Sequence, residues 1–338
     1  MSPDQIREYF ENLKKELEGI PPTHIINCDE TSMRDDPSAK AAIFRKGVRY
    51  PEQVKDHSKT CFSTMFACTA AGELLPTMTV FKSPSGNFYD TWATGAPQGS
   101  VFSANKAGWF NMRECEVWLE KVLLVWLEGR IPKEEVKVLI MDNLSSHLSL
   151  KIIELCREHN IRLVFLPANS THLTQPLDVA VFAAIKKQWR EELDEFKEWC
   201  VRNNVRNVTI PKDKFGGLLK AMLEKNVINN ANNIKAGFAA CGIYPLNVNR
   251  VLSRLPPETD ERQNVQDRLS QQLLDQLKKN RYGDQEKKTR AKKINRLPAG
   301  TAYTVSAVAE QVTVEGDGPG PSGVGRAAGG GRGAGGGR

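Results

Sequence analysis

The sequence predicts an α/β fold in which helices flank a mixed β-sheet. Two apolar runs, 24–28 and 136–141, have the length and composition of buried strands. Two further runs, 61–69 and 74–81, are joined by the short turn A-A-G-E and predict a hairpin. Segments with apolar residues at helical spacing then alternate with a last strand, 161–166. These three observations define the fold class.

The order of the elements narrows the fold further. Three antiparallel-type strands come first, followed by helix, strand, helix, strand and helix. Right-handed crossovers after a meander give a five-stranded mixed sheet with helices on its faces, the ribonuclease-H-like arrangement. The run 42–50 is a weaker strand candidate, and 83–108 is expected to be loop because it is rich in Ser, Gly, Pro and Asn. Helical spacing marks four segments: 3–18, 111–127, about 148–159 and the segment that begins at Pro176.

The composition changes after residue 200, where the pattern becomes helical and polar. Helices are expected at 215–226 and 232–241. The Gly/Arg-rich end is low-complexity sequence of the kind that stays disordered. We therefore expect four parts: a ribonuclease-H-like domain at 1–200, a helical C-terminal part at 201–258, a basic helical or linker segment at 259–296, and a disordered tail at 297–338.

The charge of the chain favours a polyanionic partner. The formal net charge is +7 and the pI is about 9.0. Residues 278–296 hold nine Lys or Arg and two acids, so the rest of the chain is close to neutral. The block K-K-T-R-A-K-K within it resembles a nuclear import signal, with a solvated flexible tail as the alternative. Its cations are candidate nucleic-acid contacts: Lys287, Lys288, Arg290, Lys292 and Lys293.

Other compositional features exclude some classes of protein. The seven cysteines are odd in number, scattered and without C-x-x-C spacing, which favours reduced thiols over disulfides or zinc. We find no apolar run that could span a membrane and no signal pattern at the start. No motif indicates a small-molecule cofactor, and a homodimer is an option that the sequence leaves open.

Three aspartates lie beside the predicted core elements of the fold. Asp29 and Asp142 each follow an apolar strand, and Asp178 falls one turn into the helix that begins at Pro176. A carboxylate beside a core strand costs solvation unless a ligand stabilises it. Three carboxylates from three core elements suit a site with two Mg²⁺ or Mn²⁺ ions about 3.5–4 Å apart, which cleaves phosphodiester bonds. Asp29 would lie between both ions, Asp142 would hold one and Asp178 the other.

Polar residues near these acids are candidates for supporting roles. Asn143 and His147 follow Asp142 in a turn and are expected to orient ligands or substrate. Gln175 either contacts the phosphate backbone or orders its loop. A lone acid after a strand is more often a turn or cap residue, but three together reverse that preference. The rival acids Glu30, Asp35 and Asp36 are expected in a solvated exit loop.

Four motifs carry a resemblance to a known family: N-C-D-E-T (27–31), M-D-N-L-S-S-H (141–147), T-H-L-T-Q-P-L-D (171–178) and I-K-A-G-F-A-A-C-G-I-Y-P-L-N (234–247). In this order they resemble the DDE-type transposases of the pogo branch, which includes the Tigger, Jerky and centromere-protein-B relatives. The resemblance covers residues 5–250. It implies that Asp29, Asp142 and Asp178 are the catalytic, metal-binding acids, and that the activity is strand nicking and strand transfer at transposon ends.

The chain departs from that family in one respect. Pogo-type transposases carry helix-turn-helix DNA-binding domains ahead of the first acid, whereas this chain has a single helix there. The expected function is therefore a nuclear, magnesium-dependent DNA endonuclease or transposase domain. The alternative is a domesticated derivative that binds DNA or chromatin without catalysis. A third option is that residues 251–296 mainly mediate protein contacts.

Overall fold

A mixed seven-stranded sheet forms the centre of the structure. The computed structural model describes residues 2–34, 61–142, 149–205, 209–225, 231–255, 299–300 and 302–303. The strand order is β4-β3-β2-β1-β5-β6-β7. Neighbouring strands are parallel in the pairs β1–β5, β5–β6 and β3–β4, and antiparallel in the others. The strands are β1 Ile25–Arg34, β2 Cys61–Thr69, β3 Met78–Lys82, β4 Val101–Asn105, β5 Lys137–Met141, β6 Ile161–Phe165 and β7 Ala302–Tyr303.

The central block β3-β2-β1-β5-β6 confirms the predicted ribonuclease-H-like sheet. The expectation that 83–108 is loop was wrong, because this segment contains β4. All of β4 is partly exposed and it pairs only with β3, so its sequence lacks the apolar run that marks a core strand. The strand that begins at Ile25 is also longer than expected. It continues through polar residues to Arg34 because β2 pairs with it over that length. The candidate strand 42–50 lies outside the described residues.

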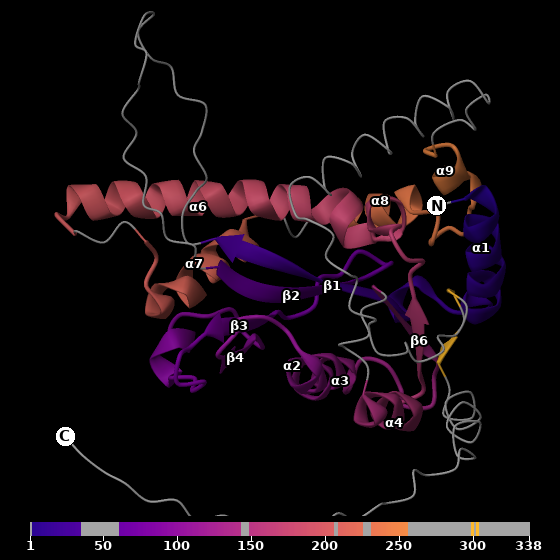
Figure 1. The fold of residues 1–338 in the computed structure, drawn as a ribbon, viewed down its shortest axis with the longest axis horizontal. Coiled ribbons are helices and arrows are strands. Elements are labelled where there is room, and N and C mark those ends of the chain that lie inside the picture. The colour runs from indigo at the N-terminus through magenta and orange to yellow at the C-terminus, as the bar shows by residue number, and fades with distance from the viewer. Residues whose placement is uncertain are drawn as a thin grey trace, which may run out of the picture.

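Helices cover both faces of the sheet. Figure 1 shows α6 running along one side and α2, α3 and α4 gathered on the other. Two separate apolar clusters fill these faces. The helices are α1 Pro3–Leu17, α2 Met112–Trp118, α3 Leu124–Leu127, α4 Leu150–Glu158, α5 Thr171–Thr174, α6 Phe182–Arg202, α7 Lys212–Glu224, α8 Ala231–Ala240 and α9 Asn249–Leu252. The π-helical turns η3 Leu119–Leu123 and η5 Leu177–Val181 lead directly into α3 and α6, and the 3₁₀ turns are η1 Pro22–His24 and η2 Asp90–Ala93.

The helices after residue 200 share the core of the sheet domain. Phe215 of α7, Phe238 of α8 and Val251 of α9 are fully buried in the cluster that covers the α6 face. Most of the segments 259–296 and 297–338 lies outside the described residues. The six cysteines whose side chains are described are buried free thiols. Within the described ranges, no helix has the length and apolar character needed to cross a membrane.

A glycine allows α8 to approach the turn η5 closely. A Cβ atom at Gly237 would lie 2.9 Å from the carbonyl oxygen of Pro176 and 3.1 Å from Cβ of Ala180. Asn233 of the same helix donates a hydrogen bond from Nδ2 to the carbonyl oxygen of Ala180. Because backbone surrounds the site, a larger side chain at Gly237 would push η5 away from α8.

We predict that Gly237→Ala lowers the free energy of unfolding by about 1–3 kcal/mol through this overpacking. Gly217→Ala is the matched control, because a Cβ at this helical position of α7 meets no atom within 4 Å. The control should be neutral or up to about 1 kcal/mol more stable, owing to the helix propensity of Ala. Chemical denaturation of both variants measures the difference, and equal stability of the two would contradict the close packing.

Candidate active site

The first two acids follow neighbouring strands and belong to the same face of the sheet. β1 and β5 are parallel, with Asn27 opposite Ile140. Continuing that register by two residues on each strand brings Asp29 opposite Asp142. Side chains alternate between the two faces of a strand. Ile25 and Ile140 point into the cluster under α6, so Asp29 and Asp142 also belong to that face.

The third acid reaches this face from η5. Leu177 and Val181 of this turn are buried in the same cluster, and Asp178 lies between them in the first turn after Pro176, as predicted. The negative charges of Asp178 and Asp142 both raise the pKa of Asp29. The three acids therefore interact electrostatically on a single face of the sheet.

The protonation of Asp29 reflects this crowding. Burial raises its pKa to about 8, and the charges of Asp178 and Asp142 contribute in the same direction. Two hydrogen bonds oppose the rise: the N–H of Glu30 donates to Asp29 Oδ1 at 2.8 Å, and the side chain of Gln175 also bonds the carboxylate. Partial desolvation raises the pKa of Asp178, while the charge of Lys186 lowers it.

A divalent cation would relieve the repulsion among these acids, and carboxylate oxygens are the ligands that Mg²⁺ prefers. The donor set therefore fits such an ion in charge and chemistry. However, no three His, Cys, Asp or Glu side chains in the described ranges lie close enough together to hold a metal ion. Metal binding by Asp29, Asp142 and Asp178 stays a prediction.

A buried pair of amides connects the strands to the segment that carries Asp178. Asn27 Nδ2 donates to the carbonyl oxygen of Ile140 at 2.9 Å and to Oε1 of Gln175. Gln175 Nε2 donates to the carbonyl oxygen of Cys28, and the N–H of Leu177 donates to Oδ1 of Asn27, both at 3.3 Å. Both amide side chains are fully buried. This network fixes the start of η5, and with it Asp178, beside β1 and β5.

The network decides between the two roles considered for Gln175. Its fully buried side chain exposes no surface to a phosphate, so the predicted phosphate contact was wrong. The side chain instead orders its loop through its hydrogen bonds. Asn27 was not predicted to have a role in the site, although it stands in the N-C-D-E-T motif. The available signal was a polar residue at an inward-facing position of a core strand.

The other candidates have mixed outcomes. The expectation for Glu30 was wrong: it lies within β1, is partly buried and accepts a hydrogen bond from Ser63 Oγ, because pairing with β2 extends the strand. Strand alternation directs it to the opposite face from Asp29. Several candidates fall outside the described residues: Asp35, Asp36, Asn143, His147, Lys287, Lys288, Arg290, Lys292 and Lys293.

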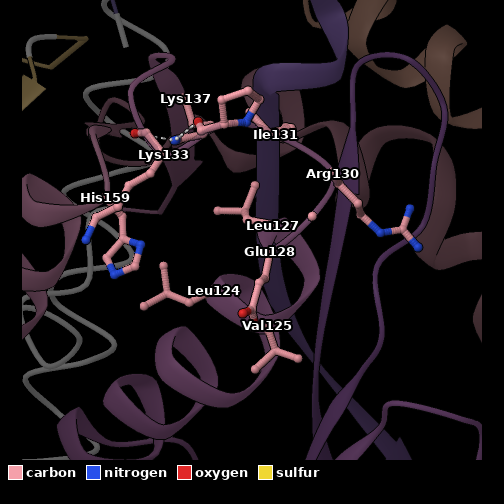
Figure 2. A pocket seen from close by; sticks show the side chains of 11 residues that line it. Leu124, Val125, Leu127, Glu128, Arg130, Ile131, Lys133, Lys137 and His159 are labelled. Atoms are coloured by element: carbon pink, nitrogen blue, oxygen red, sulfur yellow. Dashed lines mark hydrogen bonds between the residues drawn. The ribbon is translucent and has the colours of Figure 1, made fainter.

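A cavity beside the start of β5 lies away from the acids. It has a volume of about 670 Å³ and borders the start of β5, whereas Asp142 follows the end of that strand. Figure 2 shows Lys133 and His159 side by side at one wall and Arg130 pointing away from them. Its cations already have partners: Lys133 pairs with Glu158 at 2.9 Å, and Lys137 Nζ donates to two backbone carbonyls at 3.0 Å. We therefore assign these contacts to the stability of the turn before β5.

Comparison with known proteins agrees with this architecture. Residues 59–198 match the family described as DDE superfamily endonuclease. Over 228 residues the chain is 24% identical to the human "Pogo transposable element with KRAB domain", which covers 64% of this chain and 35% of that protein. It is 22% identical over 190 residues to the human "Pogo transposable element with ZNF domain", and the alignment covers 55% of this chain and 13% of that protein. It is also 27% identical over 206 residues to "MFS-type transporter clz9" of Cochliobolus lunatus, and the alignment covers 61% of this chain and 21% of that protein.

Solved structures of Mos1 transposase are similar at lower identity. The paired-end complex with the left transposon end is 11% identical and covers 70% of this chain and 62% of its own, with a TM-score of 0.39. The catalytic domain of Mos1 mariner transposase is 11% identical, covering 72% and 96%, with a TM-score of 0.35.

The motifs predicted this likeness to DDE superfamily endonucleases, and the match over residues 59–198 confirms the likeness. The likeness extends to pogo transposable elements of human and mouse, at 22–24% identity. The chain spans between about 13% and 35% of the lengths of the curated relatives it matches. The narrower likeness to Tigger and Jerky elements stays a prediction.

The amide network generates a stability prediction. Asn27→Ala should lower the free energy of unfolding by about 1–3 kcal/mol, because it leaves the buried amide of Gln175 and the carbonyl of Ile140 without their donor. Gln175→Ala should have a similar effect, and the double variant should lose less than the sum. Urea denaturation of the four proteins gives the coupling energy. Strict additivity would mean that the two side chains stabilise the fold independently.

The pKa of Asp29 generates a prediction for stability against pH. Between about pH 4 and pH 8 the folded chain holds a proton on Asp29 that the unfolded chain releases. Stability contributed by this group is therefore lost as pH rises through that window. In metal-free buffer, Asp29→Asn should be as stable as the wild type near pH 4 and more stable at pH 8, by on the order of a few kcal/mol.

Urea denaturation at pH 4, 6 and 8 measures this difference. Asp90→Asn is the control, because this exposed carboxylate in η2 lies outside the group of acids. A stability difference between Asp29→Asn and the wild type that does not change with pH would contradict the raised pKa.

Proposed function

We propose that this chain is the catalytic domain of a metal-dependent DNA endonuclease or transposase, with Asp29, Asp142 and Asp178 as its catalytic acids. The observation that supports the proposal is the convergence of these acids on one face of the sheet, where two of them raise the pKa of the third. Mutual repulsion of this kind destabilises a fold and is typical of functional sites.

The geometry suggests a division of roles among the acids. Asp29 interacts with both of the others, so it is the residue that would bridge two ions, while Asp142 and Asp178 would each hold one. The N–H of Glu30 holds Asp29 Oδ1, which limits the rotation of the carboxylate. Two bound Mg²⁺ or Mn²⁺ ions would activate the attacking water or 3′-hydroxyl and stabilise the leaving oxygen.

DNA is the proposed substrate, and the nucleus is the proposed location. Support comes from the net charge of +7, the names of the pogo relatives, and the basic block at 287–293. The polyanionic backbone would bind a basic chain through neutralisation of its phosphates.

A DNA-binding derivative without catalysis is the second candidate. The observation that favours it is the spacing of the acids: in the part of the chain that the structure describes, no acidic cluster is tight enough for a metal ion. In that case, the charge and the fold would serve DNA or chromatin binding alone.

A nicking assay separates the two functions. The full chain is incubated with labelled duplex DNA and Mg²⁺ or Mn²⁺, beside Asp142→Asn and the control Asp90→Asn. The wild type and the control should nick DNA in the metal but not in EDTA. Asp142→Asn should be slower by on the order of 100-fold or more, because loss of a metal ligand removes several kcal/mol of transition-state stabilisation.

Equal DNA binding by the wild type and Asp142→Asn, with nicking by neither, would support the binding protein instead. Nicking that persists undiminished in Asp142→Asn would exclude this residue as a catalytic acid.

A further inference from the structure

A groove runs between the end of β1 and the first half of α6. It has a volume of about 320 Å³ and is formed by residues 32–34 of β1 together with Lys186, Trp189 and Arg190 of α6. We call it the β1–α6 groove. Among the described strands, only β2 pairs with β1 beyond Asn27, so the other edge of β1 faces this groove.

The groove is cationic, and none of the described residues that line it is acidic. Arg34, Lys186 and Arg190 are exposed at its rim. Some surface cations elsewhere in the described ranges are paired with acids, such as Arg130 with Glu73 at 2.7 Å and Lys151 with Glu120 at 2.8 Å. None of the three cations of the groove forms an ion pair with an acid of the described ranges. Their charge is therefore available to an anionic ligand.

The charge of α6 changes sign along the helix. The turns nearest to Asp178 carry Lys186, Lys187 and Arg190, whereas the next turns are mainly acidic, with Glu191, Glu192, Asp194, Glu195 and Glu198. A phosphate would therefore be attracted to the end of the helix that lies beside the acids and repelled from the other end.

The two walls of the groove are fixed to each other. Trp189 Nε1 donates a hydrogen bond to the carbonyl oxygen of Arg34 at 2.7 Å. The indole is 3% exposed and packs edge-on against Phe215, with 5.3 Å between ring centroids. The groove is therefore built before any ligand arrives, which reduces the entropy lost on binding.

Both walls belong to the elements that carry the acids. Ser32 lies three residues beyond Asp29, about 10 Å along β1. Lys186 lies eight residues beyond Asp178, about 12 Å along the helix, and its ammonium is close enough to lower the pKa of that acid. These distances place the groove within a few nucleotides of the acids along a bound strand.

We propose that the β1–α6 groove binds a backbone phosphate of the DNA within a few nucleotides of the cleaved bond, with Arg34, Lys186 and Arg190 as phosphate-binding residues. This inference rests on the proposed function, because it assumes a DNA strand whose scissile phosphate lies at the acids. The groove holds that strand in register with Asp29, Asp142 and Asp178.

The test measures how DNA affinity depends on salt. The full-length double variant Lys186→Gln/Arg190→Gln is titrated against a fluorescent DNA duplex in EDTA at several salt concentrations, with anisotropy as the readout. It should bind more weakly than the wild type, and its slope of log K against log salt should be smaller by about 1–2, since each phosphate contact contributes about 0.9. Lys186→Arg/Arg190→Lys keeps both charges and should restore most of the slope.

The matched control is Lys121→Gln/Arg157→Gln. It makes the same change of net charge at exposed residues in η3 and α4, which cover the opposite face of the sheet. Its slope should remain that of the wild type. An equal loss in both double variants would overturn the groove proposal, because it would show a response to net charge alone. An unchanged slope in Lys186→Gln/Arg190→Gln would also overturn it.

The binding assay also separates this inference from the proposed function. Asp142→Asn should bind with the wild-type slope, because the assay contains no divalent metal. If the wild type never nicks DNA but the groove variant has a smaller salt slope, the groove proposal is supported and the proposed catalytic function is contradicted. If the wild type nicks DNA and the groove variant keeps the wild-type salt slope, the proposed catalytic function is supported and the groove proposal is contradicted.

Discussion

The hydrogen bonds between Asn27 and Gln175 hold the candidate site together. Their amides connect β1, β5 and the loop before η5, and both side chains are fully buried in the core. A buried polar network is strong when all its members are paired and expensive when one is lost. The position of Asp178 relative to Asp29 and Asp142 therefore depends on a contact that is buried away from the surface.

The three acids lower the stability of the fold at the site that they form. Packing around β1 favours neutral side chains, yet Asp29 lies among buried residues and beside two other carboxylates, which raise its pKa to about 8. A sequence selected only for stability would replace such a group with an apolar or amide side chain. Lys186 of α6 offsets part of the charge at Asp178, so the helix that continues from η5 supplies a cation that stabilises the acid.

The C-terminal helices explain the fourth motif in physical terms. Gly237 lets α8 touch the backbone of Pro176, and Gly242 takes a left-handed conformation with φ of 66° in the turn that follows α8. A Cβ at Gly242 would clash with the carbonyl oxygen of Asn247, so only glycine fits this turn. The motif at 234–247 thus supports the turn that carries Asp178 from the side away from the sheet.

The sequence by itself determined the class of the fold, the order of the central strands and the positions of Asp29, Asp142 and Asp178 on core elements. These features follow from apolar periodicity and from acids placed beside it, which are local properties. It did not reveal β4 or the polar half of β1, because both depend on a neighbouring strand rather than on their own composition. The roles of Asn27 and Gln175 and the β1–α6 groove were decided only by the tertiary structure. Each of them joins residues more than 140 positions apart, and no local pattern records which distant side chains will meet.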